Sequence, residues 1–452
     1  MDGPLDFEIE DPLVTSPAPT RKKVIGLDDL VSDYFNEKGK EVERESKRAK
    51  SSKYYDSDEE EEYGREALLS KKIDECRNQM KSMGCEEEFF AWGLQLFGDQ
   101  RVPPSLPYEF RSFSILQSFM SNELNSVVGL NEQQGNTFLE GLLVNGWLLK
   151  LVFTCKNVEK PISEWTFHLM LYSARDELVA SACDFWCAIL SSKETADGTA
   201  MIIEWNPSYF ELKKAMESYG YIFNDSISKL VNPDSNQRGP QRNIRSWLKF
   251  VAEYCRGRSE RSVLETAQAE ELLQIVICLS LDRQLQGLLV LLRQTMQSII
   301  EYFNEEEWNS SIEKIAINLA CRVPGDLNCL RAVEFISGIN FRSNQLRSIF
   351  SYHVMLVCLD NKVSNEEDIL CLLISVDLKD KKCDLFNVYI HLALTEYWLL
   401  SDIKIKDKEV IHAMFGLFLR NCTCHISSTD LRPYASKVRT KASFLLHGTN
   451  TK

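Results

Sequence analysis

Glycine and proline are scarce in this sequence, which has 20 glycines and 13 prolines in 452 residues. Together they make up about 7%, against roughly 12% in average proteins, which argues against collagen-like, linker-dominated and turn-rich all-β chains and favours long helices. Apolar runs of the roughly 18 residues that a membrane helix needs are missing too, since the longest candidate, Leu272–Leu281, contains Gln274 and Ser280. The start, Met1–Asp6, has no apolar signal region. We therefore expect a soluble, intracellular protein that does not enter a membrane.

An excess of positive charge is also absent, because the chain carries a net charge of −14. Residues 1–66 contain 19 acidic and 11 basic residues and so supply −8 of it. Four of the 13 prolines lie in the first nineteen residues, and few aliphatic residues follow Val42 up to residue 66. Such a segment cannot bury enough apolar surface to offset its ordering entropy. The sequence therefore predicts a disordered acidic N-terminal tail over residues 1–66 that carries short linear motifs, and disfavours a globally basic nucleic-acid binder.

The rest of the chain has helical periodicity. Apolar residues recur three and four positions apart, for example in Leu288–Phe303, and turn-forming residues separate the runs, for example in Val323–Asp326. We predict an all-α body over residues 67–450, with a helical lead-in over 67–102 and the main body over 103–450. About 12–18 helices in an irregular HEAT-like stack suit this length better than a single bundle. Ala200–Trp205 is the best candidate for a strand, although it could equally begin a buried helix.

No catalytic fingerprint is present: the chain has no Gly-rich phosphate loop, no His-Glu-x-x-His and no Gly-x-Ser-x-Gly element. The tightest group of potential metal ligands, Cys422, Cys424 and His425, lacks the second ligand pair of a zinc site. Most of the 14 cysteines lie in apolar runs, and we expect them to be buried thiols. Examples of cysteines that we expect to be buried are Cys183, Cys187, Cys278 and Cys371. We expect neither a cofactor nor a metal, and no enzymatic activity.

One segment of the tail is amphipathic. On a helix, Leu27, Leu30, Val31 and Tyr34 fall on one face, with Phe35 beside them, and acidic residues occupy the opposite face. A helix this short is marginal alone in water. Our hypothesis is that it folds when it docks its apolar face into a groove of a partner, and the alternative is that it packs onto the body of its own chain.

Two further features of the tail resemble short motifs that other proteins recognise. A basic cluster resembles a nuclear localisation signal and consists of Arg44, Lys47, Arg48, Lys50 and Lys53. Ser57 precedes a run of acidic residues, the pattern that acidophilic kinases favour, so phosphorylation there would add to the negative charge. The alternative for this run is a solubilising acidic patch.

Residues 238–261 carry a local charge of +5 in an otherwise acidic chain. The cationic residues are Arg238, Arg242, Arg245, Lys249, Arg256, Arg258 and Arg261. Trp247, Phe250 and Tyr254 are interleaved at the spacing of a helix's buried face. The segment is therefore either an amphipathic helix with a solvated basic side or a contact for DNA phosphates or for an acidic partner.

Three segments carry a resemblance to a known family: Pro107–Phe110, Leu142–Leu148 and Pro161–Met170. Together they resemble the CANIN domain. The tail segment Leu27–Val31 is similar to the short leucine-containing motif that precedes the helical domain in that family. The resemblance covers residues 100–445 and the tail motif, and it is greatest to plant members, whose partner is the helical immune-repressor protein SNI-one.

The resemblance implies a nuclear, non-enzymatic scaffold. It would form a heterodimer with a Nse-type, SNI-one-like helical subunit, contact the Smc five-six coiled-coil and head subunits, and help to recruit or regulate that complex in DNA repair and recombination. In plants the family role extends to DNA-damage signalling and to the restraint of defence genes. ATP hydrolysis and SUMO ligation belong to other subunits. The alternative is a HEAT-like nuclear adaptor or transcriptional cofactor that binds peptides and has no connection with SMC machinery.

Overall fold

The structure is a computed structural model, and it describes part of the chain. The described residues are 92–104, 114, 132–192, 201–223, 240–256, 264–336, 338, 340–360, 363, 365–401 and 408–449. All of them belong to one compact unit, residues 81–452. The tail predicted over residues 1–66 and most of the predicted helical lead-in, residues 67–91, lie outside the described residues.

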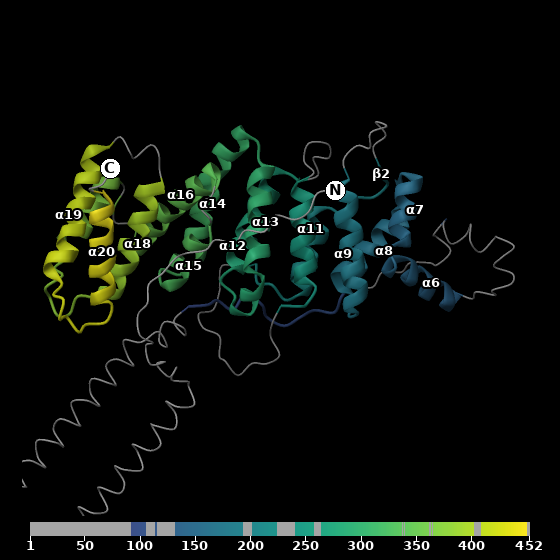
Figure 1. The fold of residues 1–452 in the computed structure, drawn as a ribbon, viewed down its shortest axis with the longest axis horizontal. Helices are drawn as coiled ribbons and strands as arrows, with labels where there is room; N and C mark the ends of the chain where they lie inside the picture. The colour runs from purple at the N-terminus through teal and green to yellow at the C-terminus, as the bar shows by residue number, and fades with distance from the viewer. Residues whose placement is uncertain are drawn as a thin grey trace, which may run out of the picture. The chain divides into compact units, whose positions relative to one another are not determined.

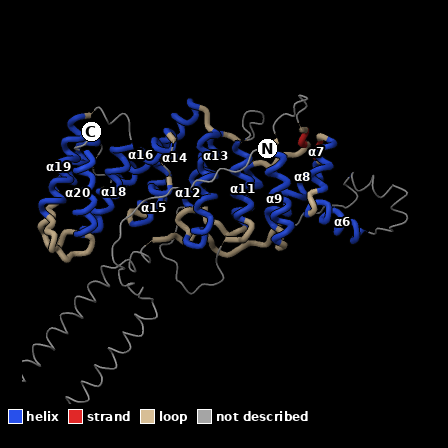
Figure 2. Tube along the Cα trace, in the orientation of Figure 1, coloured by secondary structure: helices blue, strands red, loops and turns tan. Residues whose placement is uncertain are grey.

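Helices make up almost all regular structure in this part of the chain, as Figures 1 and 2 show, so the predicted all-α body is confirmed. None of the described helices is by itself long and apolar enough to cross a membrane. The elements are α6 (Glu132–Val144), α7 (Trp147–Cys155), β1 (Asn157–Val158), α8 (Lys160–Tyr172), α9 (Asp176–Ser191), β2 (Ile202–Ile203), α10 (Tyr209–Ser218), α11 (Ile244–Arg256), α12 (Thr266–Leu279), η2 (Arg283–Leu288), α13 (Leu289–Tyr302), α14 (Glu305–Arg322), α15 (Leu327–Phe335), α16 (Phe341–Cys358), α17 (Glu366–Ser375), α18 (Leu385–Ser401), α19 (Glu409–His425) and α20 (Ala435–Thr449).

Local sequence signals explain where several of these helices begin and end. The side chain of Asn304 accepts the backbone N–H of Glu307 at 2.8 Å, and the Glu307 carboxylate accepts the N–H of Asn304 at 2.9 Å. This capping box satisfies donors that the first turn of α14 leaves open. Helix α14 ends at Arg322, at the predicted break, and Asp326 caps α15 by accepting the N–H of Asn328 at 2.8 Å. The break predicted over residues 323–326 is therefore confirmed.

The helices pack in sequence order, and most contact the helix two places further along the chain. Helix α11 lies between α9 and α13, and a second series runs through α12, α14, α16, α18 and α20. The buried side chains form one continuous hydrophobic core from Leu94 to Leu445. Such neighbour-to-neighbour packing is typical of helical stacks, in which each unit buries its apolar face on the next. The assignment to a HEAT-like type stays a prediction.

The segment predicted as either a strand or a helix start contains a strand. Strand β2 pairs with β1 in parallel, with Asn157 opposite Ile202 and Val158 opposite Ile203. The carboxylate of Glu204, which follows β2, accepts hydrogen bonds from Asn157 Nδ2 and the backbone N–H of Lys160, both at 3.0 Å. These bonds lower the pKa of Glu204 and tie the start of α8 to the end of β2.

Residues 92–102, predicted to belong to a helical lead-in, instead lie in an extended segment that reaches residue 104, so the prediction was wrong for residues 92–102. Leu94, Leu96 and Phe97 are buried in the core. The backbone hydrogen-bonds to distant segments: the N–H of Leu94 donates to the carbonyl of Leu281 at 3.0 Å, and that of Gly98 donates to Gly220 at 2.8 Å. These tertiary bonds replace the i→i−4 bonds of a helix, and sequence periodicity does not display such partners.

The prediction that cysteines in apolar runs are buried holds for some positions and fails at another. Cys278 and Cys183 are buried and Cys187 is half-buried. Cys371 is exposed although its neighbours Ile369 and Leu370 are buried, so the prediction was wrong there. Helix α17 packs mainly on α19, and residues on its outward side face solvent whatever their polarity.

Candidate functional site

Many of the residues singled out in the sequence lie outside the described residues. These are Leu27, Leu30, Val31, Tyr34, Phe35, Arg44, Lys47, Arg48, Lys50, Lys53, Ser57, Arg238, Arg258 and Arg261. Four cationic residues of the predicted basic segment are described, namely Arg242, Arg245, Lys249 and Arg256. The docking helix, the nuclear localisation signal and the phosphorylation site stay predictions.

The inner face of α11 is aromatic and fully engaged. Trp247 donates its indole N–H to the carbonyl of Leu212 at 3.1 Å, and Tyr254 donates its hydroxyl to Pro207 at 2.7 Å. Phe250 packs edge-on against Phe167 and Trp186, with ring centroids 5.2 and 5.7 Å apart. The three aromatic residues at helical spacing thus form a buried face, as the sequence predicted.

The outward side of α11 carries the cations. Arg245, Lys249 and Arg256 recur on this side together with Glu253, and Arg242 lies just before the helix. Arg242 forms an ion pair with Asp176 at the start of α9, with 3.3 Å between Nη1 and Oδ2. Arg256 pairs with Glu253 within the helix. Among the described residues, Arg245 and Lys249 form no such ion pair.

Helix α9, which packs beside α11, changes the electrostatics of this surface. It contains Asp176, Glu177 and Asp184, all exposed, and no Lys or Arg. Residues 240–256 have four cations and one acid, a charge of +3, which the three acids of α9 offset. The surface is therefore mixed in charge rather than uniformly basic, and the proposed contact with DNA or an acidic partner stays a prediction.

Two thiols lie under the cationic side of α11. Cys183 and Cys187, one turn apart on α9, have their Sγ atoms 3.9 Å apart, and Cys183 donates to the carbonyl of Ser246 at 3.8 Å. The hydrogen bond with Cys187 lowers the pKa of Cys183, and the charge of Lys249 acts in the same direction. The pKa of Cys187 is raised by its contact with Cys183 and by burial.

The Cys422–His425 group is split between the core and the surface. Cys422 is buried, where burial raises the pKa of its thiol to about 12, whereas Cys424 and His425 are exposed. Within the described ranges, no group of three or more His, Cys, Asp or Glu side chains is arranged to hold a metal ion.

Helix α7 presents apolar side chains to solvent near one end of the described series of helices. Its main contacts are with α6 and β1. Trp147 is 55% exposed, and Leu151, one turn further along the same face, is exposed too. The ammonium of Lys150 lies 4.4 Å from the centroid of the Trp147 ring, a cation–π contact that leaves the rest of the indole open.

The last two described helices, α19 and α20, share this property. Val410 and Leu417 lie two turns apart on one side of α19 and are exposed, and Phe444 on α20 is 74% exposed. Isolated apolar residues are common on protein surfaces. Here, however, they recur at spacings that keep them on one helix face, as on α7, which is the arrangement that marks interaction surfaces.

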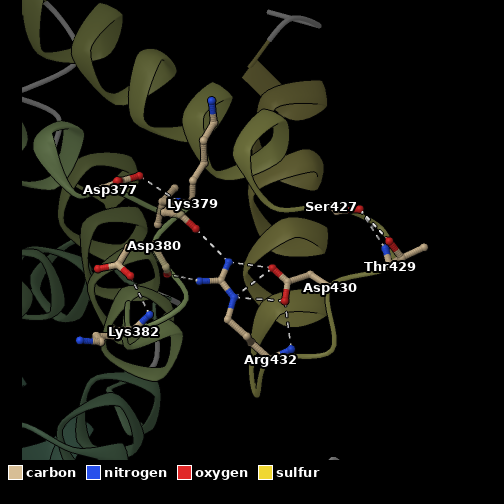
Figure 3. A network of polar contacts seen from close by, with 9 residues as sticks. Asp377, Lys379, Asp380, Lys382, Ser427, Thr429, Asp430 and Arg432 are labelled. Atoms are coloured by element: carbon tan, nitrogen blue, oxygen red, sulfur yellow. Dashed lines mark hydrogen bonds and ion pairs between the residues drawn. The ribbon is translucent and has the colours of Figure 1, made fainter.

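An arginine anchors the loop that leads into α20 (Figure 3). Arg432 Nε donates to both carboxylate oxygens of Asp430 at 3.1 Å, and Nη2 donates to Oδ2 at 2.7 Å. The same guanidinium donates to the carbonyls of Leu378 at 2.8 Å and Asp380 at 2.6 Å, in the loop between α17 and α18. Arg432 lowers the pKa of Asp430. The contacts hold the α19–α20 pair against the preceding helices.

The sequence interpretation missed the two exposed apolar faces. Helix α7, Trp-Leu-Leu-Lys-Leu-Val-Phe-Thr-Cys, has one charged residue, so its polarity pattern does not distinguish an inner from an outer side. The signal that was present is an excess of apolar residues over what one buried stripe requires.

Comparisons of the chain with protein-family models, with curated proteins and with solved structures found no match.

Proposed function

We propose that this chain is a non-enzymatic scaffold whose helical body pairs with a second helical subunit. Following its resemblance to the CANIN family, that subunit is of the Nse type, and the pair serves the Smc five-six complex in the nucleus during DNA repair and recombination. The amphipathic segment Leu27–Phe35 would tether the pair to the complex.

The observation that carries the pairing is the set of apolar side chains on the outward faces of α7 and of α19–α20. Helical stacks remain soluble when the helices at their ends have a polar outer surface. Here the helices near both ends of the described series expose Trp147, Leu151, Val410, Leu417 and Phe444 instead. Large aromatic and aliphatic side chains of this kind form the cores of protein–protein interfaces.

A permanent partner of this kind would bury on the order of 2,000 Å² or more. Since that area includes apolar side chains that are otherwise in contact with water, the chain expressed alone should self-associate. Co-expression with the partner should give a stable 1:1 complex. A chain that stays monodisperse at high concentration without a partner would count against the proposal.

The partner is identified by affinity purification of the full chain, followed by mass spectrometry with crosslinks mapped to residue pairs. Recovery of Smc and Nse subunits, with crosslinks to α7 or α19–α20, supports the proposal. Recovery of importins or Mediator-type proteins instead of SMC subunits would replace it with the peptide-binding nuclear adaptor.

Charge insertion tests the faces themselves. Trp147→Glu/Leu151→Glu and Val410→Glu/Leu417→Glu should each weaken recovery of the partner by at least tenfold, because a buried unpaired carboxylate is costly. Val290→Glu is the matched control, since Val290 is 70% exposed but lies on α13, away from these helices. Equal loss in all three variants, or in none, would contradict a specific role of the outward faces.

A further inference from the structure

Helix α19, which Figure 1 shows at one end of the described series of helices, is apolar on two sides. Its inner side packs on α17 and α20. The residues that it buries there are Ile411, Phe415, Phe418, Leu419 and Cys422. Its outer side exposes a second series of residues, which we call the α19 seam. The seam consists of Val410, Ala413, Leu417, Arg420 and Cys424, all of them exposed.

The α19 seam has the spacing of a coiled-coil interface. From Val410 to Cys424 its members follow one another at steps of three, four, three and four residues. This alternation is that of the a and d positions of a heptad repeat, which keeps side chains in one narrow stripe along a helix. Val410 is 59% exposed and Leu417 is 43% exposed. A stripe with this spacing receives the side chains of a second helix between its own, so the outer side of α19 has the shape that a helix would fit.

The surroundings of the seam are cationic. Residues 409–449 form α19, α20 and the loop between them, and they contain five Lys or Arg against two Asp or Glu, a charge of +3 in a chain of net charge −14. Helix α20 has no acidic residue. One of the two acids, Asp430, is bound by Arg432. Within the described residues, Arg420 and Arg439 form no ion pair, and the printed contact of Arg420 is with the carbonyl of its own helix.

An apolar stripe in cationic surroundings favours one kind of partner. DNA phosphates would pair with the cations and leave the apolar stripe in contact with water. A helix flanked by Lys or Arg would fit the stripe but would be repelled by the cations. A helix that has apolar residues at heptad spacing and carboxylates beside them satisfies both features.

We propose that the α19 seam docks an acidic amphipathic helix, with a carboxylate of that helix opposite Arg420. The docking rests on the proposed pairing with a second helical subunit, and it specifies the charge of the helix that this subunit contributes.

Two synthetic peptides test the docking on the full chain. Both have three heptads with Leu at a and d, and the acidic peptide has Glu at e and g where the basic peptide has Lys. Cys424 is the reporter, because its exposed thiol belongs to the seam, and the exposed Cys321 on α14 is the internal control. Labelling with iodoacetamide at about pH 8, where exposed thiols react, is quantified by peptide mass spectrometry at increasing peptide concentrations.

The acidic peptide should halve the labelling rate of Cys424 at a concentration roughly fivefold lower than the basic peptide does. The measurement is made at low ionic strength, where surface charges are screened least. The labelling of Cys321 should not change. Equal potency of the two peptides, or protection of Cys424 by neither, would overturn the proposal. Protection of Cys424 by a DNA duplex at a lower concentration than the acidic peptide needs would replace the helix with DNA.

Variants separate the stripe from its charge. Val410→Glu/Leu417→Glu should abolish protection of Cys424, and Arg420→Glu should remove the preference for the acidic peptide. Arg293→Glu is the matched control, since it makes the same change of charge at an exposed position of α13 and should keep the preference. Circular dichroism checks that the variants keep their helix content. Equal loss of preference in both arginine variants would overturn the proposal, because net charge rather than the seam would then select the peptide.

Failure of the docking can be distinguished from failure of the proposed function. If the full chain co-purifies with a helical subunit but does not discriminate between the peptides, the docking of an acidic helix is wrong and the pairing stands. If the acidic peptide protects Cys424 but no helical subunit is recovered, the seam is a helix-binding surface and the proposed pairing is wrong.

Discussion

Helices α11 and α7 each carry a tryptophan in their first turn and use it in opposite ways. Trp247 of α11 is 0% exposed and hydrogen-bonded to Leu212, whereas Trp147 of α7 is 55% exposed. Helix α11 has neighbours on two sides, α9 and α13, while α7 contacts mainly α6 and β1. The difference teaches that the position of a helix in the stack, rather than its composition, decides whether its aromatic residues stabilise the fold or face outward.

Removing the two tryptophans gives the sharpest test of this contrast. Trp247→Ala should lower the free energy of unfolding by about 3–5 kcal/mol, because it removes a large buried ring and leaves a cavity. Trp147→Ala should change it by no more than about 0.5 kcal/mol, as at other exposed positions. Urea unfolding followed by circular dichroism measures both. A comparable loss in the two variants would show that Trp147 is a core residue.

The stability of the α19–α20 end of the stack should depend on the polar contacts of Arg432 more than on buried aromatic side chains. Arg432→Ala removes a charge-assisted network and should lower the free energy of unfolding of this end by about 2 kcal/mol. Arg420→Ala is the matched control, since Arg420 is exposed on α19 and, among the described residues, its side chain bonds only to the carbonyl of Gly416 in its own helix. Hydrogen exchange of α20 amides separates loosening of this end from global unfolding.

The same network has a defined dependence on pH. The pKa of Asp430 is lowered in the folded state, so its contribution to stability is present above the unfolded pKa and is lost as the pH falls through the folded pKa. The difference in stability between the unmodified chain and Arg432→Ala should therefore shrink on acidification below about pH 4. A difference that is constant from pH 7 to pH 3 would contradict the assignment.

The buried carboxyl group of Asp282 has the opposite pH dependence to Asp430. Burial raises the pKa of Asp282 to about 6, although the N–H groups of Gln284 and Leu96 oppose the shift. The folded chain then binds a proton that the unfolded chain releases, so this group's contribution to stability falls as the pH rises through about 4–6. Asp282→Asn should stabilise the protein by on the order of 1 kcal/mol at pH 7.5, with the gain vanishing near pH 4. Thermal unfolding at both pH values measures this.

The smallest effect on stability is expected on the outward side of α11. Arg245→Glu/Lys249→Glu should change the free energy of unfolding by about 0.5 kcal/mol, because Arg245 is exposed, Lys249 is half-buried, and neither forms an ion pair within the described residues. If this side binds DNA phosphates, the variant should also reduce the slope of log affinity against log salt by about 2. Fluorescence anisotropy with a labelled duplex at several salt concentrations measures the slope, and an unchanged slope would end the DNA interpretation.

Sequence periodicity was reliable where one helix face is buried and the other is not. It predicted the inner side of α11, with Trp247, Phe250 and Tyr254, and turn chemistry predicted the break before Asp326. It failed for residues 92–102, where Leu94, Leu96 and Phe97 are buried in an extended segment that hydrogen-bonds to Gly220 and Leu281. It also failed at Cys371, because an apolar run does not state which of its residues face a neighbouring helix.

The amino-acid pattern alone determined that this is a helical protein with many helices, since scarce glycine and proline and three-to-four spacing act within a few residues of chain. The tertiary structure alone decided that α7 and α19 turn apolar side chains outward and that Arg432 bridges Asp430 to the carbonyls of Leu378 and Asp380. Those properties depend on which helices become neighbours, and that is set by the packing of segments far apart in the sequence.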